Sequence, residues 1–425
     1  MSHFDYLGLL EKELVIAVGC TEPIAVAYAA AVAKSQIPDE SIKGIVVRAS
    51  QGIIKNAMAV SIPGADDSGL VLAATLGALC GNADLHLEVL RDVSQACIDE
   101  AKLHAHEWTK VYVAENTTDL YIEVLVTTTT RSAKVIIADR HDLVIRIEVD
   151  DQVVFDREHI SEEKMPDLTD EFTLNDLFDF VDQVPIDRLG LIELSIKLNR
   201  AISIEGLQKG YGLQVGKIIY GGDVDNPGKA MSQITNYAVS LTASGSDARM
   251  AGVMLPVMSN SGSGNQGICC TVPVVAVAEK LDLPYERLVR AVLLSNLVAI
   301  FIKRSFGRLS AMCGVIAAST GASCGVVYLM DGKPGQIRAA IQNMLGTVTG
   351  MLCDGAKCGC AMKVATGVFA AMQSAILAIE GMSISSIEGI VENEAENTIM
   401  NLGRLAKEGM PNMNDVLLDI MLNKR

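Results

Sequence analysis

The sequence predicts an α+β protein, with a smaller N-terminal α/β part that contains an antiparallel β-meander and a larger all-helical C-terminal domain. Two patterns predict this class. Residues 110–155 are rich in Val, Ile, Thr and Tyr and alternate in polarity with a period of two, as antiparallel strands do. From about residue 172 to the end, apolar residues recur at helical spacing. We place the domains at 1–165 and 172–425, with an acidic link at 161–171 between the two patterns.

The N-terminal part begins with residues 6–35, which predict a helix that is interrupted near GCTEP. Gly19 and Pro23 disfavour a continuous helix there, whereas Thr21 can cap a second helix and Pro23 suits its first turn. Residues 42–60 are expected to begin as a strand and then to become helical. Whether the helices around 6–35 pack on the C-terminal domain is left open.

The remaining segments follow in chain order. We expect helices at 69–80 and around 93–105. Turn residues divide the meander into strands at 115–116, 131–132 and 140–142. In the C-terminal domain, glycine-rich segments are expected to form turns between helices at 220–229, 259–267 and 313–325.

The charge balance argues against nucleic acid as a partner. There are 35 Lys and Arg against 51 Asp and Glu, which gives a formal net charge of −16. An acidic surface of this kind repels phosphate backbones.

The start of the chain and its apolar runs indicate a cytoplasmic protein. Asp5, Glu11 and Glu13 stand where a signal peptide would be basic. The apolar runs at 69–80, 292–302 and 368–379 are shorter than the ~20 residues that span a bilayer. We therefore expect no membrane partner and ten reduced cysteines, and the sequence leaves open a homodimer.

The cysteines of the C-terminal half are the strongest functional signal. All six histidines lie in the first 159 residues, so a metal in the C-terminal half would have thiolate ligands. All-thiolate ligation favours an iron–sulfur cluster or zinc. Cys353 and Cys360 are seven residues apart in the polar segment CDGAKCGC, where Cys358 is a further candidate. We expect the following cysteines to be inert core residues: Cys80, Cys97, Cys269, Cys270 and Cys324.

Cys20 is a separate candidate. It lies just before a predicted helix start, where the helix dipole favours the thiolate and can lower the pKa of the thiol from its free value near ~8.5. A reactive thiol and a buried cap are both compatible with this position.

The segment SGSGNQG at 261–267 contains a formal G-x-G-x-x-G. A dinucleotide fingerprint needs a strand, a helix and then a second strand, but a further helix is predicted after the first one. We prefer a glycine loop that opens a helix, whose free N–H groups can bind a small carboxylate, although a structural turn is an alternative. The candidate binding residues are Ser261, Gly262, Gly264 and Asn265.

Four segments in this order resemble the L-cysteine desulfidase family, which is related to the alpha chain of the iron–sulfur L-serine dehydratases. They are GCTEPIAVAYAAA, SNSGSGNQG, AMCG and CDGAKCGCAMK, and the likeness covers nearly the whole chain. Members of that family are described as using an oxygen-sensitive 4Fe–4S cluster rather than pyridoxal phosphate. The resemblance implies that Cys313, Cys353 and Cys360 ligate the cluster and that the Cys20 thiol is the catalytic base.

The resemblance therefore implies a β-eliminating lyase of amino-acid catabolism, with 172–425 as its catalytic domain. L-Cysteine would yield pyruvate, ammonia and sulfide, and L-serine is the alternative substrate. Lys357 or Arg249 could assist in binding. Two other hypotheses stay open: a zinc-stabilised, non-catalytic helical scaffold, and a pyridoxal-phosphate lyase that uses Lys229.

Overall fold

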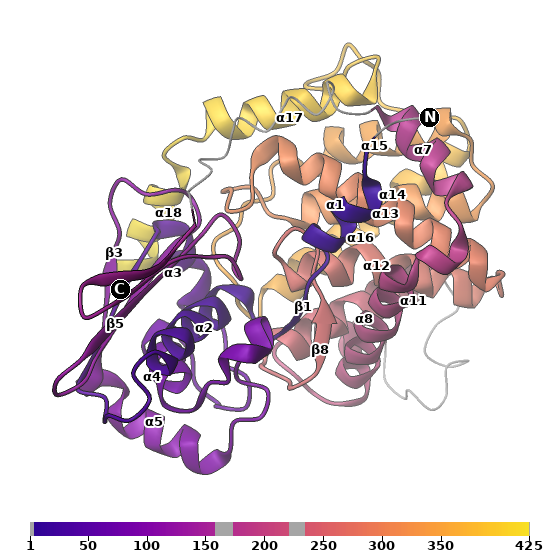
Figure 1. Cartoon of the computed structure of the whole chain (residues 1–425). Coiled ribbons are helices and arrows are strands. Elements are labelled where there is room, and N and C mark those ends of the chain that lie inside the picture. Colours follow the sequence, from indigo (N-terminus) through magenta and orange to yellow (C-terminus); the bar gives the residue numbers. More distant parts are fainter. Residues whose placement is uncertain (1–3, 158–172, 221–233, 425) are drawn as a thin grey trace.

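The computed structural model describes residues 4–157, 173–220 and 234–424. It confirms the α+β class: an N-terminal sheet with its helices lies beside a larger helical part (Figure 1). The predicted link at 161–171 lies outside the described residues, as do Lys229 and all but the first residue of the glycine segment at 220–229. The domain boundaries themselves remain a prediction.

The sheet of the N-terminal part has six strands in the order β3-β2-β4-β5-β6-β7. The strands are β2 (Gly44–Ala49), β3 (Thr109–Val113), β4 (Tyr121–Thr127), β5 (Ser132–Ala138), β6 (Val144–Val149) and β7 (Gln152–Asp156). The meander is confirmed for β4 to β7, but β3 pairs in parallel with β2 and is not part of it. Parallel pairing needs a crossover, which the helices between β2 and β3 supply.

Helices cover one face of this sheet, and every second residue of β4 is buried against them. They are α2 (Thr21–Ser35), α3 (Gln51–Ala57), α4 (Leu70–Cys80), the 3₁₀ helix η1 (Ala83–Glu88) and α5 (Gln95–Trp108). The predicted helices at 69–80 and 93–105 and the strand-to-helix change within 42–60 are confirmed.

The remaining helices build the larger part. One exception is α18 (Met413–Leu422), which packs against α3 beside the sheet (Figure 1). The others are α1 (Tyr6–Glu13), α7 (Leu174–Gln183), η2 (Ile186–Arg188), α8 (Gly190–Gln208), α9 (Val215–Tyr220), α11 (Ile234–Met250), α12 (Gly264–Lys280), α13 (Tyr285–Phe306), α14 (Val315–Leu329), α15 (Pro334–Val348), α16 (Cys360–Ile379) and α17 (Ala395–Gly409). Their apolar faces form one large hydrophobic cluster, and α2, α4 and the sheet form a second.

The segment 6–35 is divided between the two hydrophobic clusters. Tyr6 and Leu10 of α1 belong to the cluster of the larger part, whereas α2 belongs to that of the sheet. Between them lies β1 (Ile16–Val18), which pairs antiparallel with β8 (Pro256–Met258). The predicted break near GCTEP is therefore confirmed, and the short strand before it was not predicted.

The glycine-rich segment 313–325 is mostly helical, which contradicts the predicted turn, because α14 begins at Val315. Its small residues serve close helix packing instead. A Cβ at Gly321 would lie 2.2 Å from the carbonyl oxygen of Ser295 on α13, so the two helices could not approach so closely with a larger residue.

One described helix, α16, is longer than the apolar run from which it was predicted. With 20 residues it is long and apolar enough to cross a membrane, by length and composition only. Half of its apolar window is buried inside the protein, which is also the pattern of a core helix.

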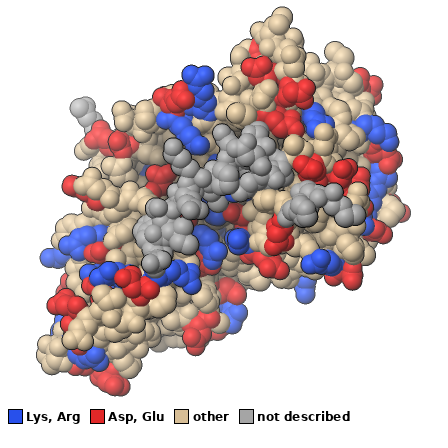
Figure 2. Space-filling model, turned by 45° about the horizontal axis from the view of Figure 1, so that its top comes forward, with Lys and Arg blue, Asp and Glu red and all other residues tan. Residues whose placement is uncertain are grey.

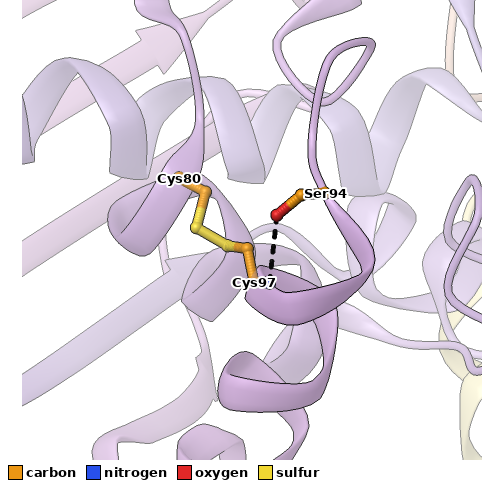
Figure 3. Close-up of a disulfide and its surroundings, with 3 residues drawn as sticks. All are labelled: Cys80, Ser94 and Cys97. Atoms are coloured by element: carbon orange, nitrogen blue, oxygen red, sulfur yellow. Dashed lines mark hydrogen bonds between the residues drawn. A yellow bond between two sulfur atoms is a disulfide. The ribbon is translucent and has the colours of Figure 1, made fainter.

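Cys80 and Cys97 form a disulfide, which contradicts the expectation of ten reduced thiols (Figure 3). Cys80 is the last residue of α4, and Cys97 lies in the first turn of α5, where its N–H donates to the Ser94 hydroxyl. Packing of the two helix ends brings the Cα atoms to 6.6 Å, within the range that a disulfide bridges. The two cysteines are 17 positions apart in the sequence, and no local pattern indicated that they pair.

We expect a thiol titration to reveal this bond. In 6 M denaturant without reductant, the metal-free protein should react as eight thiols, and as ten after reduction. The Cys97→Ser variant should instead give nine thiols under both conditions. Ten thiols in the unreduced wild type, purified without reductant, would show that the disulfide does not form.

Candidate active site

Cys20, rather than Thr21, occupies the N-cap position of α2, and its side chain makes no capping hydrogen bond. The side chain is 2% exposed, and its Sγ donates to Oε2 of Glu22 at 3.0 Å. Burial raises the pKa of Cys20 well above its ordinary value, Glu22 raises it further, and Arg249 acts in the opposite direction. Desolvation of the buried thiol therefore opposes the effect of the helix dipole, and the role of Cys20 as a base stays a prediction.

Glu22 is the centre of a buried hydrogen-bond network. Its Oε1 accepts from Nδ2 of Asn56 at 2.8 Å, and its Oε2 accepts from the Thr21 hydroxyl at 3.1 Å. Burial by itself would raise the pKa of Glu22, but His141 and the hydrogen bonds from Cys20 and Asn56 outweigh it, and the pKa lies below its ordinary value. A carboxylate thus stands beside a neutral thiol.

His141 comes from the turn between β5 and β6 and lies against the glycine loop. It is 4% exposed, and a Cβ at Gly262 would lie 3.1 Å from its Cε1 and Nδ1 atoms. Burial lowers the pKa of His141, and the Glu22 carboxylate opposes this shift. Its Nε2 has no hydrogen-bond partner among the described residues, which leaves a buried polar atom free for a ligand.

The glycine loop at 261–267 follows β8 and continues into the first turn of α12, which begins at Gly264, and hydrogen bonds hold both of its ends. The Ser261 hydroxyl donates to Oδ1 of Asn260, and the Ser263 hydroxyl accepts from the Gln266 N–H as the cap of α12. Gly262 has φ +83°, which glycine tolerates, and its carbonyl accepts from Thr21 at 2.8 Å. Since β8 pairs only with β1 and α12 leads into α13, no dinucleotide-binding βαβ unit forms here.

Arg249, at the end of α11, brings a buried positive charge to this loop. It is 3% exposed, its Nη2 donates to the Gly19 carbonyl at 2.8 Å, and its Nη1 donates to Oδ1 of Asn265 at 3.3 Å. Its Nε has no partner among the described residues. A Cβ at Gly264 would lie 2.3 Å from this Nε, so only glycine leaves room for the guanidinium. The other candidate, Lys357, is paired with Asp354 instead.

The three predicted ligand cysteines lie in one region. Cys313 and Cys353 stand on two short antiparallel segments: the N–H of Cys313 donates to Met351 at 2.9 Å and that of Cys353 to Ala311 at 2.7 Å. Burial raises the pKa of Cys313 to about 12, and the neighbouring Cys353 and Cys360 add to this. Cys360 begins α16.

The Cys20 region lies beside two of these thiols, those of Cys353 and Cys360, although it is far from them in the sequence. It shares a small hydrophobic cluster with Val60 and Met250, against which Cys360 packs. The network of Glu22 also reaches Cys353, whose Sγ lies 3.9 Å from Oδ1 of Asn56. The base candidate and two ligand candidates therefore adjoin.

Three free cysteine thiols are the ligand type that a thiolate-bound cluster needs. Their sulfurs do not surround one common point in this structure. Among the described residues, no three Cys, His, Asp or Glu side chains form a ready-made metal site. The fit rests on three free thiols in one region with cations around them. Cys313 and Cys353 raise the pKa of the buried Lys303, which burial lowers to about 8. The assignment of Cys313, Cys353 and Cys360 stays a prediction.

Cys358, the additional thiol, lies near Gly212 in the segment between α8 and α9. A Cβ at Gly212 would lie 3.5 Å from its Sγ and 3.5 Å from Oδ1 of Asp247. Asp247 is 1% exposed, and burial raises its pKa to about 6. Cys358 therefore contacts the segment between α8 and α9.

The site includes residues that the sequence reading passed over. Glu22 stands in the quoted segment GCTEP, and a carboxylate two residues from a candidate base was a usable signal. For His141 the only signal in the sequence was its position in a predicted turn. For Lys303 it was the position of one cation in a long apolar helix. Their proximity to Cys20 and Cys353 depends on tertiary packing.

Comparisons with known proteins show the family of the chain. Residues 85–419 match the family model described as serine dehydratase alpha chain, and the chain belongs to this family. It is also similar over nearly its whole length to proteins named UPF0597. The relative from Oleidesulfovibrio alaskensis is 44% identical over 99% of this chain and 98% of its own, and that from Bacteroides thetaiotaomicron is 42% identical over 98% and 97%.

The alkylation of Cys20 by iodoacetamide should reveal its raised pKa in the metal-free protein. Its rate, followed by peptide mass spectrometry, should reach half its maximum at a pH above that of an ordinary thiol. Glu22→Gln should move this midpoint to lower pH, because a neighbouring negative charge is removed. Glu205→Gln, whose carboxylate pairs with Lys209, is the control and should leave it unchanged. A wild-type midpoint below pH 8 would contradict this account.

Proposed function

We propose that this protein is an iron–sulfur-dependent β-eliminating lyase that converts L-cysteine to pyruvate, ammonia and sulfide. The observation that carries the proposal is the adjacency of three features: the Cys20–Glu22 pair, the buried Arg249 beside the glycine loop, and the free thiols of Cys353 and Cys360. L-Serine is a second candidate substrate, since the matching family model is described as serine dehydratase alpha chain.

The substrate carboxylate would bind between Arg249 and the start of α12. The N–H groups of Gly264 and Asn265 have no hydrogen-bond partner among the described residues, and the dipole of α12 favours an anion there. The unpaired Nε of Arg249 lies at the same place and can donate to a carboxylate oxygen. Two independent features thus favour one negatively charged group.

Cys20 would remove the Cα proton, with Glu22 as its partner. In the described state the thiol is protonated and donates to Glu22, so it cannot accept a proton until it has lost its own. The carboxylate 3.0 Å away is the nearest described acceptor for that proton. Asn56 and Thr21 hold the carboxylate in place during this transfer.

Cys313, Cys353 and Cys360 would hold a 4Fe–4S cluster. When bound, such a cluster supplies an iron that acts as a Lewis acid on the β-thiol or β-hydroxyl leaving group. Loss of the Cα proton and of the leaving group gives aminoacrylate, which tautomerises and hydrolyses to pyruvate and ammonia. Burial of Cys20, Glu22 and His141 keeps bulk water away from the reacting carbon.

We further propose a cytoplasmic enzyme whose partner is its small amino-acid substrate, with neither nucleic acid nor membrane involved. Acidic and basic side chains are interspersed over the face in Figure 2, in a chain of net charge −16. Such a surface offers phosphate backbones little attraction. A homodimer is compatible with this proposal.

An anaerobic reconstitution with iron and sulfide tests the function. The protein should become brown, contain iron and acid-labile sulfide, and form pyruvate from L-cysteine faster than from L-serine. Cys20→Ala should retain the cluster and lose the exchange of the substrate Cα proton with solvent deuterium. A colourless protein that binds zinc and produces no pyruvate would support the scaffold alternative and refute the lyase.

Gly264→Ala tests the carboxylate site. The added Cβ would displace Arg249, so KM for the amino acid should rise roughly 10–100-fold, as for the loss of a charge-assisted hydrogen bond, with the iron content unchanged. Gly335→Ala, in the first turn of α15 with open space around it, is the matched control and should behave as wild type. Calorimetry should detect no binding of NAD or ATP. A wild-type KM in Gly264→Ala would place the carboxylate elsewhere.

A further inference from the structure

Helix α16 has an outer face that the hydrophobic core does not use. Half of the apolar window of this helix is buried inside the protein. On its outer side, four large apolar side chains are between 41% and 54% exposed: Met362, Phe369, Ile376 and Leu377. The first three are seven residues apart, which is two helical turns, so they form one stripe along the helix.

The stripe continues past the end of the helix. The N–H of Gly381 donates to the carbonyl of Ala378 at 3.0 Å, and the N–H of Met382 donates to that of Leu377 at 2.8 Å. These two bonds, with φ +77° at Gly381, are the pattern of a Schellman motif, which brings Met382 next to Leu377. Met382 is 60% exposed. We call the following five side chains the α16 face: Met362, Phe369, Ile376, Leu377 and Met382.

The α16 face carries no charge. From Cys360 to Ile379 the sequence contains one Lys and no Arg, Asp or Glu, and this Lys363 is paired with Asp354. Thr366 and Gln373, which lie between the apolar residues of the stripe, are neutral. The chain as a whole has a net charge of −16, so two copies repel each other in most orientations. Their approach costs least where no carboxylate stands.

The stripe is complementary to a second copy of itself. Met362 and Ile376 are each seven residues from Phe369, one on either side. A two-fold axis at Phe369 would therefore pack two α16 helices antiparallel, with Met362 of one copy against Ile376 of the other. In such an isologous contact, each apolar side chain meets an apolar side chain and no unpaired charge is buried.

The area of the stripe suits a reversible dimer. A helix of 20 residues is ~30 Å long and ~10 Å wide. Two such faces in contact bury on the order of 1,000 Å² in total, which is the lower limit for a specific interface. We therefore expect a dissociation constant of roughly 1–100 µM.

A membrane is a less suitable occupant of this face. A helix that lies on a bilayer presents Lys and Arg beside its apolar side. The one basic side chain of α16 is instead held by Asp354, and anionic lipids repel an acidic chain.

We propose that the α16 face is the interface of a homodimer, in which two α16 helices pack antiparallel around Phe369. This inference does not depend on the proposed function, because the contact requires neither a substrate nor a cluster.

Sedimentation velocity of the whole chain tests the interface. Wild type should change from monomer to dimer between ~1 and ~100 µM. Phe369→Glu should raise the dissociation constant at least ~100-fold, because two carboxylates would be buried against each other at the axis. Leu103→Glu adds the same charge on α5, at a side chain that is 76% exposed, and should dimerise as wild type does. Both variants should keep the melting temperature of the wild-type monomer, since both positions lie at the surface.

The salt dependence distinguishes an apolar contact from ion pairs. Raising NaCl from ~50 to ~500 mM should not weaken the wild-type dimer, because screening lowers the repulsion between acidic copies and leaves an apolar contact intact. A dimer that dissociates at high salt would point to a different, charged interface.

Cysteine cross-linking tests the orientation, with wild type as the control for native thiols. Under mild oxidation, Phe369→Cys should form a covalent dimer on a non-reducing gel. Met362→Cys alone should not, because its two copies would lie ~20 Å apart along antiparallel helices, beyond the reach of a disulfide. An equimolar mixture of Met362→Cys and Ile376→Cys should cross-link.

Several outcomes would overturn the proposal. A wild type that stays monomeric at ~100 µM would do so, as would a dimer that Phe369→Glu leaves intact. Cross-linking of Met362→Cys with itself would contradict the antiparallel arrangement. Binding of wild type, but not of Phe369→Glu, to vesicles of phosphatidylcholine and phosphatidylglycerol would assign the face to a membrane instead.

Discussion

The buried guanidinium of Arg249 is the interaction on which the site depends. It binds the carbonyl of Gly19, just before Cys20, and the side chain of Asn265 in the first turn of α12. These contacts join the start of α2, which belongs to the hydrophobic cluster of the sheet, to the glycine loop of the helical part. The hydrogen bond from Thr21 to the Gly262 carbonyl reinforces the same junction. Together with the pairing of β1 and β8, this charge holds the base candidate against the anion site.

Burial and close charged neighbours shift the pKa values of the groups in this site. A thiol, a carboxylate, an imidazole and a guanidinium share a region from which water is largely excluded, and burial and charged neighbours shift the pKa values of the thiol, the carboxylate and the imidazole. In water these four groups would titrate almost independently. Here the proton of Cys20 is held next to the Glu22 carboxylate, so a change in charge on substrate binding can move it.

Local patterns in the sequence were sufficient for most of the fold. The period-two pattern of residues 110–155 predicted the antiparallel strands β4 to β7, and the breaks at Gly19 and Pro23 predicted the start of α2. The pattern failed for β3, because the pairing of a strand with β2 across several helices has no local signature. It also failed at 313–325, where glycines and serines serve close helix packing rather than turns. The disulfide between Cys80 and Cys97 was not predicted either, because a contact between two helix ends has no local signature in the sequence.

The sequence by itself determined the α+β class, the kinds of chemical group available and the four ordered segments that resemble an iron–sulfur lyase family. It could not choose between Arg249 and Lys357, because that choice depends on which cation is already paired with a carboxylate. Only the tertiary structure decided that the Cys20 thiol donates its proton to Glu22, that His141 lies against the glycine loop of the C-terminal half, and that Cys358 contacts the segment around Gly212. These outcomes depend on desolvation and on contacts between segments far apart in the chain, and neither is encoded in the spacing of neighbouring residues.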